Sequence, residues 1–280
     1  MTDVYKPLDP IALKLGPLEI HWYGVIIALG IFVAIFLSMK EAEKRGIDED
    51  TIIDMALWTI PIAFVGARLY YVIFELGYYL ENPSQIIAIW NGGIAIYGGL
   101  IAGGLTVYWF TKKRNISLWL MLDILAPHVL LAQAIGRWGN FINQEAHGSE
   151  VTRGFLESLM LPEFIVNQME INGLYYHPTF LYESLWSLIG FVVIILLRNR
   201  EYLLLQGEVA LSYAMWYSFG RFFIEGLRTD SLYIPGTPIR VSQLLSAIIF
   251  VGALIIWIYR RRDYPKKPYY TDGIKVQKKK

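Results

Sequence analysis

The chain has 280 residues, of which 55% are hydrophobic and 18% charged, and its formal net charge is +1. The apolar residues lie in long blocks of about 20, the length that a helix needs to cross the hydrocarbon core of a membrane. We therefore expect an all-α polytopic membrane protein. Cysteine is absent, which excludes disulfides, thiolate metal sites and a cysteine nucleophile supplied by the chain itself.

Seven apolar segments are predicted to be transmembrane helices. They cover Ile20–Met39, Ile52–Glu75, Ile94–Thr111, Leu118–Phe141, Thr179–Leu197, Gly207–Glu225 and Ile239–Tyr259. Lysine and arginine gather in alternate connections, which together hold 17 of the 25 such residues. Because positively charged loops stay in the cytoplasm, the N-terminus is predicted to lie outside and the C-terminus in the cytoplasm.

The chain is expected to divide into an extracytoplasmic N-terminal segment, a seven-helix membrane domain and a basic cytoplasmic tail, at residues 1–19, 20–259 and 260–280. The connection at 143–178 is long enough for a small extracytoplasmic cap, which is either functional or a spacer. Asn172 and Gly173 within it, between strand-forming residues, predict a hairpin. The tail is either solvated or attracted to anionic headgroups.

Arginines inside three apolar segments are the most informative polar residues. Arg68, Arg137 and Arg221 each fall in the outer half of a predicted helix. Because arginine is not deprotonated in proteins and a charge within the membrane needs a partner, we expect an anion to bind near them. Other polar side chains lie at the same outer level, namely His21, Tyr23, Tyr97, His177, Tyr182 and Glu183.

Arg137 has the strongest case for function. It shares a helix face with Asn140, three residues further on, and is followed by Asn143, Glu145 and Gly148. Polar side chains and glycines in this pattern favour a helix end that opens into a polar cavity.

Two other arginines have alternative interpretations. Arg221 and Glu225, one turn apart, are either a structural ion pair or part of a site. Arg68 is either a site residue or a helix-end residue whose stem carries its charge to the interface. Gly98-Gly99 and Gly103-Gly104 predict close helix packing, with ligand access as the alternative, and His128 is interpreted as a packed, hydrogen-bonded histidine rather than a ligand. Four scattered histidines without cysteine make no metal set, and no phosphate-binding loop is present.

The run from Gly136 to Glu145, continuing to Gly148, resembles the signature of the bacterial prolipoprotein diacylglyceryl transferases. Further similar stretches are His21-Trp22-Tyr23-Gly24, Gly66-Ala67-Arg68-Leu69, Gly92-Gly93 with Tyr97-Gly98-Gly99-Leu100, His177-Pro178-Thr179 with Leu181-Tyr182-Glu183, and Gly220-Arg221-Phe222-Phe223-Ile224-Glu225 with Arg228. Seven helices and an outside N-terminus agree with the topology of that family.

The resemblance implies transfer of the diacylglyceryl group of phosphatidylglycerol to the lipobox cysteine of a preprolipoprotein, at the bacterial cytoplasmic membrane. It implies no cofactor, no metal and no nucleic acid. Phosphatidylglycerol would supply the anion that the arginines need. The expected catalytic residues are Arg137, Arg221 and Tyr97. The expected substrate-binding residues are Arg137, Asn140, Asn143, Glu145, Gly148, Tyr23, His21, Arg68, Glu225 and Arg228.

Tyr97 departs from the pattern of the family, in which many members carry a histidine proposed as the general base at this place. A phenol is a poor base at neutral pH. Tyr97 is therefore either a base activated by the arginines or a group that hydrogen-bonds phosphate or thiol.

Other classes of protein fit the sequence less well. A transporter or channel for an anionic substrate would also place arginines in a membrane cavity, but the inner halves of the helices carry little beyond Asp54 and Asp123. A lipid-binding scaffold would have no need for Asn140 and Glu145. A retinal receptor would need a lysine in the last helix, and none is present at 239–259.

Overall fold

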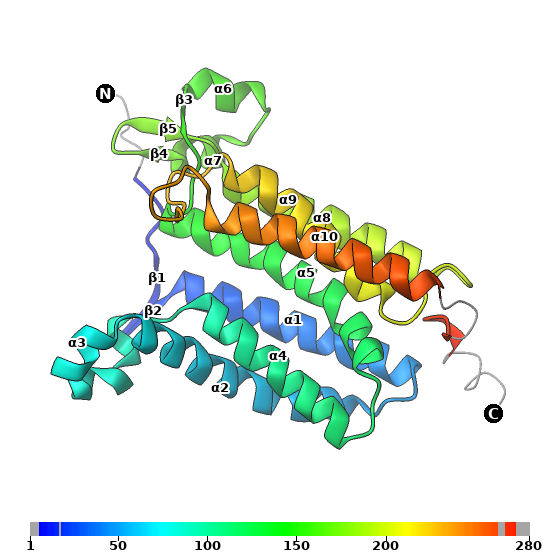
Figure 1. The fold of residues 1–280 in the computed structure, drawn as a ribbon. Helices are drawn as coiled ribbons and strands as arrows, with labels where there is room; N and C mark the ends of the chain where they lie inside the picture. Colours follow the sequence, from blue (N-terminus) through cyan, green and yellow to red (C-terminus); the bar gives the residue numbers. More distant parts are fainter. Residues whose placement is uncertain (1–5, 17, 263–266, 273–280) are drawn as a thin grey trace.

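The computed structural model describes residues 6–16, 18–262 and 267–272. Seven helices of at least 18 residues make up most of it (Figure 1). They are α1 (Trp22–Lys44), α2 (Glu49–Phe74), α4 (Ile96–Lys113), α5 (Leu118–Asn143), α8 (Thr179–Arg198), α9 (Glu208–Glu225) and α10 (Val241–Arg262). By length and composition, five of these, α1, α2, α5, α8 and α10, are apolar enough to cross a membrane.

The helices lie within a few residues of the predicted positions, and the residues just before the first helix form a strand. Ile20 and His21 belong to strand β2 (Leu18–His21), which pairs with β1 (Ile11–Leu15), and helix α1 starts at Trp22. Gly16, with a φ of 62°, lies in the turn between these strands. The chain is mostly helical, as expected, and two small sheets accompany the helices.

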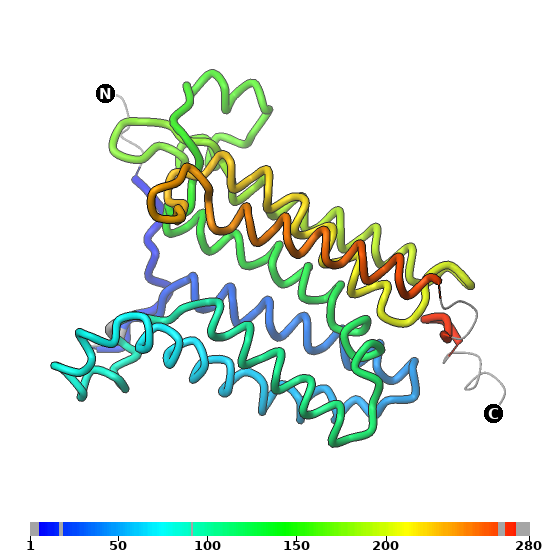
Figure 2. Tube along the Cα trace, in the orientation of Figure 1, coloured from blue at the N-terminus to red at the C-terminus, as the bar shows by residue number. Residues whose placement is uncertain are grey.

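Helix α5 lies at the centre of the bundle. It packs against α1 on one side and against α8 and α9 on the other, α2 packs along α4, and α10 lies on α9 (Figure 2). A Cβ on Gly98 of α4 would collide with the backbone of Gly66 on α2, and one on Gly139 would lie 2.7 Å from the ring of Tyr23. Glycine at these positions lets helices approach closely, as predicted for Gly98.

One end of the bundle, which we call the cap end, carries the insertion between α5 and α8 (Figure 1). This insertion contains α6 (Arg153–Ser158), α7 (Glu163–Gln168) and a sheet of β3 (Glu150–Val151), β5 (Leu174–Tyr176) and β4 (Glu170–Ile171), in that order. The hairpin predicted at Asn172 and Gly173 is confirmed, because both residues have positive φ and join β4 to β5. Near this end, α3 (Leu76–Glu81), η1 (Pro83–Ile87) and η2 (Ile89–Asn91) link α2 to α4.

The opposite end, which we call the basic end, carries the connections rich in lysine and arginine. Part of the predicted tail is packed there. The backbone N–H of Tyr270 donates to the carbonyl of Leu204 at 2.8 Å, and its hydroxyl donates to Glu41 at 2.7 Å. Tyr270 is 1% exposed, and the guanidinium of Arg45 lies 3.6 Å from its ring centroid. Residues 267–272 are therefore docked, whereas 263–266 and 273–280 lie outside the described residues.

His128 lies near the same buried group. Its Nδ1 is 2.9 Å from the hydroxyl of Ser38, and its Nε2 is 3.4 Å from Arg198, which also pairs with Glu41 at 3.2 Å. The prediction of a packed, hydrogen-bonded histidine is thus confirmed.

Replacing Tyr270 with alanine is expected to lower the free energy of unfolding by roughly 3–5 kcal/mol, because a fully buried aromatic side chain leaves a cavity. Tyr270→Phe removes only the hydrogen bond to a carboxylate and should cost about 1.5–3 kcal/mol. The measurement is SDS-induced unfolding in mixed micelles. Tyr259→Ala, at a side chain that is 64% exposed, is the control and should have little effect. Equal losses at Tyr259 and Tyr270 would contradict the docking.

Candidate functional site

A buried carboxylate, Glu183, joins three arginines at the cap end. Glu183 lies on the second turn of α8 and is 6% exposed. Its Oε2 is 2.5 Å from Nη2 of Arg137 on α5, and its Oε1 is 2.6 Å from Nη1 of Arg221 on α9. Nη1 of Arg228, in the loop after α9, lies 3.9 Å from the same Oε1. We call these four residues the Glu183 cluster.

Arg137 is also held from its own helix. Its Nη1 donates to Oδ1 of Asn140 at 3.2 Å, and Nδ2 of Asn140 donates to Glu145 at 2.9 Å. Helix α5 ends at Asn143, and Gln144 follows with a left-handed φ of 51°. This turn brings Glu145 back over the last turn of the helix. The three residues predicted to act together are thus linked by hydrogen bonds.

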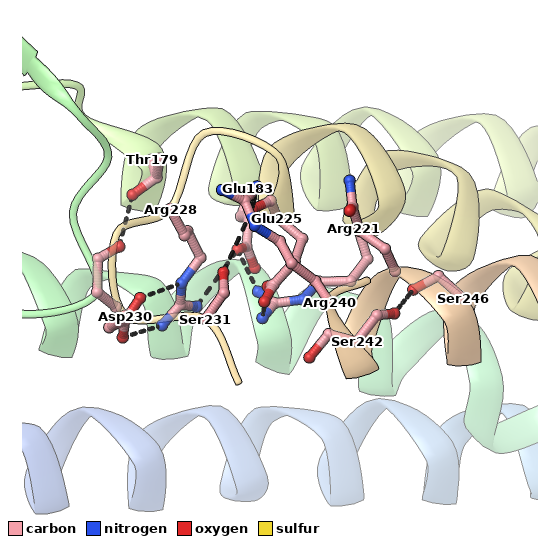
Figure 3. Close-up of polar contacts among 12 residues, drawn as sticks. Thr179, Glu183, Arg221, Glu225, Arg228, Asp230, Ser231, Arg240, Ser242 and Ser246 are labelled. Atoms are coloured by element: carbon pink, nitrogen blue, oxygen red, sulfur yellow. Dashed lines mark hydrogen bonds and ion pairs between the residues drawn. The ribbon is translucent and has the colours of Figure 1, made fainter. Parts of the chain in front are cut away.

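Two carboxylates hold the guanidinium of Arg221, and a second arginine holds the backbone of one of these acidic residues. Arg221 pairs with Glu225, one turn further along α9, as well as with Glu183. Arg240, just before α10, donates to the backbone carbonyl of Glu225 at 2.6 Å. Figure 3 shows these side chains converging between α8 and α9. The predicted ion pair of Arg221 and Glu225 is confirmed, and it is part of a larger network.

Arg228 connects the Glu183 cluster to the loop that follows α9. It makes two parallel hydrogen bonds to Asp230, at 2.9 and 2.6 Å (Figure 3). These bonds hold the pKa of the Asp230 carboxyl below its usual range, because the guanidinium stabilises the ionised form. Gly148 pairs with Arg228 in an isolated β-bridge, and a Cβ on Gly148 would lie 2.6 Å from Cβ of His177. The lack of a side chain at Gly148 therefore lets its own segment pack closely against the segment of His177 and the loop of Arg228.

Arg68 does not belong to the Glu183 cluster. Its Nε donates to the carbonyl of Ile86 at 2.9 Å, its Nη1 to those of Gly92 and Gly93 at 2.7 and 2.6 Å, and its Nη2 to that of Gln85 at 2.6 Å. The side chain is buried and holds the connection between α3 and α4. The hydrogen bonds to backbone carbonyls were not foreseen from the sequence, and a role of Arg68 in binding substrate stays a prediction.

The remaining predicted site residues make no recorded polar contact with the cluster within the described ranges. Tyr97 lies in the first turn of α4 and is half-buried, whereas His21 is exposed at the end of β2. Tyr23 packs against Gly139, and the buried Oδ1 of Asn143 has no hydrogen-bond partner among the described residues. A direct role of these four residues in the site therefore stays a prediction.

Sequence reasoning missed the central role of Glu183 and did not include Asp230 and Arg240. The signal for Glu183 was present, because it is the single acidic residue in the apolar segment predicted at 179–197. A lone carboxylate in such a segment needs a buried cation as its partner. Asp230 and Arg240 lie in a connection without periodicity, so nothing in the sequence predicted their contacts with Arg228 and Glu225.

Arg137 keeps N–H donors that its partners within the described residues do not use. Arg137 has five N–H donors, its side chain is 22% exposed, and its recorded bonds within the described residues use only Nη1 and Nη2. Carboxylates fix the guanidinium groups in place while donors remain for a further oxyanion. An arrangement of this kind suits binding and stabilisation of a phosphate group.

Comparison with known proteins supports the family resemblance that the sequence motifs indicate. The profile of the prolipoprotein diacylglyceryl transferases matches residues 10–259. The chain belongs to this family. A relative from Lactobacillus johnsonii is 57% identical over 269 residues, which cover 96% of each chain. One from Bacillus velezensis is 54% identical over 96% of this chain and 98% of its own length, and one from Listeria welshimeri is 53% identical over the full length of both. All three carry the name phosphatidylglycerol–prolipoprotein diacylglyceryl transferase.

Proposed function

We propose that the protein transfers the diacylglyceryl group of phosphatidylglycerol to the lipobox cysteine thiol of a preprolipoprotein and releases glycerol phosphate. The observation that carries the proposal is the fixed position of Arg137, bonded to Glu183 and Asn140 in a chain of this family. In this assignment the phosphate of the lipid lies against Arg137 and Arg221. Asn140, Glu145, Glu225 and Arg228 maintain the arrangement of the binding site.

The reaction forms the C–S bond of the thioether and breaks the C–O bond to the phosphate and the S–H bond of the thiol. The cysteine sulfur attacks the glyceryl carbon, the phosphate oxygen leaves with the electron pair of the C–O bond, and the thiol proton passes to water or to the released glycerol phosphate. Charge grows on the leaving phosphate, so the guanidinium groups bind the transition state more strongly than the intact lipid. Because only the thiolate is a good nucleophile, the same positive charge also favours ionisation of the thiol.

Tyr97 is proposed to hydrogen-bond the phosphate or the thiol. Tyr97→Phe is expected to lower the transfer rate partially, and Tyr97→His, which restores the residue common in the family, to keep substantial activity. The measurement is the initial rate across a pH series in reconstituted vesicles. Complete loss in Tyr97→Phe at every pH, with phosphatidylglycerol still bound, would instead assign Tyr97 an essential proton transfer.

We further propose that all seven long helices span the bacterial cytoplasmic membrane, with α4 and α9 included. The cap end then faces outward, residues 1–19 and 143–178 are extracytoplasmic, and the tail from 260 is cytoplasmic. The basic end, with its excess of lysine and arginine, supports this orientation. It would place the Glu183 cluster near the leaflet from which an exported preprotein presents its cysteine.

Single cysteines introduced into this cysteine-free chain test the orientation. A membrane-impermeant thiol reagent is expected to label cysteines at Gly173 and Asn82 in intact spheroplasts, and a cysteine at Gly46 only after permeabilisation. The readout is a mass shift on a gel. The reverse pattern would place the Glu183 cluster beside the cytoplasm and remove the geometric support for the transferase assignment.

The proposed function itself is tested with purified protein, phosphatidylglycerol vesicles and a lipobox peptide. The expected product is the thioether-linked diacylglyceryl peptide, identified by mass, together with glycerol phosphate in equal amount. The same peptide with serine in place of cysteine is the control and should remain unmodified. Absence of the thioether product under these conditions would overturn the assignment.

A further inference from the structure

A groove at the basic end lies apart from the Glu183 cluster. It has a volume of about 760 Å³, which falls in the range of about 300–1,000 Å³ typical of ligand sites. Leu197 in the groove and Glu183 are 14 residues apart on α8, which corresponds to about 21 Å along the helix. The groove is lined mainly by apolar side chains from α8, α10 and the loop between α8 and α9, namely Leu197, Leu203, Leu204, Trp257 and Ile258.

Hydrogen bonds hold the loop that forms one wall of this groove. Arg261 donates to the carbonyl of Leu203 at 2.6 Å, and the backbone N–H of Tyr270 donates to the carbonyl of Leu204 at 2.8 Å. Arg261 also binds Glu208, which is fully buried, through two contacts of 2.6 Å. The groove is therefore preformed, and the charge of Arg261 is balanced within the protein.

Arg262 also lines the groove, but within the described residues no carboxylate is paired with it. Its side chain is exposed, and no hydrogen bond or ion pair is recorded for it within the described residues. The lining residues include two arginines and no acid. An apolar groove with an uncompensated cation, located between helices at their basic end, is complementary to an acyl chain attached to an anionic headgroup.

We propose that this groove binds one anionic phospholipid from the leaflet at the basic end, with an acyl chain along the apolar walls and the phosphate at Arg262. The site goes beyond the proposed transfer reaction, since it lies at the other end of the bundle. A zwitterionic lipid would fill the same walls, but the cation of its headgroup would offset the attraction between its phosphate and Arg262.

Photolabelling in vesicles tests this site without any preprolipoprotein, so that no lipid is consumed. The probes are phosphatidylglycerol and phosphatidylcholine, each carrying a diazirine on one acyl chain, in a background of unlabelled phosphatidylcholine. Peptides that contain residues 197–204 and 257–258 are then analysed by mass spectrometry. The phosphatidylglycerol probe is expected to label them about fivefold more than the phosphatidylcholine probe, as one interfacial arginine predicts.

Two variants separate the headgroup from the chain. Arg262→Gln should abolish the preference between headgroups, and Ile258→Trp, which fills the groove, should lower labelling by both probes. Matched controls are Arg200→Gln, an exposed arginine outside the groove, and Ile255→Trp, an exposed side chain on the same helix that does not line the groove. Both controls should label like the unaltered protein.

Three results would overturn the inference. Equal labelling by the two probes in the unaltered protein would mean bulk lipid contact only. Labelling unchanged in Ile258→Trp would place the acyl chain elsewhere. Loss of the headgroup preference on addition of inorganic phosphate would mean that Arg262 binds free phosphate instead of a lipid.

Discussion

Replacing Arg137 with glutamine is expected to lower the rate of diacylglyceryl transfer by about 10²–10³-fold, the usual cost of losing one fixed donor to developing negative charge. The fold should survive, because Glu183 keeps its contacts with Arg221 and Arg228. The measurement is the rate of thioether formation with saturating phosphatidylglycerol, alongside thermal unfolding in detergent.

Arg153→Gln is the matched control for Arg137→Gln. Arg153 is a partly exposed arginine of the cap that pairs with Glu157 and Glu163, so its loss removes a positive charge from the same end of the molecule. Its transfer rate should stay close to that of the unaltered protein. Near-normal turnover in Arg137→Gln, or an equal loss in Arg153→Gln, would refute a specific role for Arg137.

Replacing Glu183 with alanine should both destabilise the protein and abolish transfer. Glu183 pairs with Arg137 and Arg221 and lies within 4 Å of Arg228, and removing one partner of a buried ion pair costs roughly 3–5 kcal/mol. Arg137 would keep Asn140, and Arg221 would keep Glu225, but the two guanidinium groups would repel each other. The measurement is SDS-induced unfolding with and without phosphatidylglycerol.

The lipid provides a diagnostic second readout for Glu183→Ala. If the arginines bind phosphate, phosphatidylglycerol should stabilise this variant more than it stabilises the unaltered protein, because the phosphate replaces the missing negative charge. Glu163→Ala, at an exposed carboxylate, is the control and should cost about 0–1 kcal/mol. Equal stabilisation of the variant and the unaltered protein by the lipid would argue that the arginines do not contact its phosphate.

Several features of the fold could be predicted from residues alone. Blocks of about 20 apolar residues identified the long helices, and the Asn172-Gly173 pair identified the cap hairpin, because both depend on local periodicity or backbone conformation. The hairpin before α1 was not foreseen, since Ile20 continues an apolar run and its pairing with Leu13 depends on a reversal at Gly16.

The candidate site was predictable where its residues share one helix. The contact between Arg137 and Asn140 and that between Arg221 and Glu225 follow from helical spacing, and both pairs are bonded in the structure. Contacts between helices did not follow from spacing. The same limit applies at the basic end, where Tyr270 joins Glu41 across more than 200 residues of chain.

The sequence by itself determined the family, the run of apolar helices and the presence of arginines in segments where a charge is costly, because composition, motif and periodicity are local properties. Only the tertiary structure decided which partners the arginines meet outside their own helices. Arg68 has backbone carbonyls as partners, whereas Arg137 and Arg221 share Glu183 from a third helix. The physical reason is that a buried charge is stabilised by whatever lies within about 4 Å of it, and that neighbourhood is set by how the helices pack.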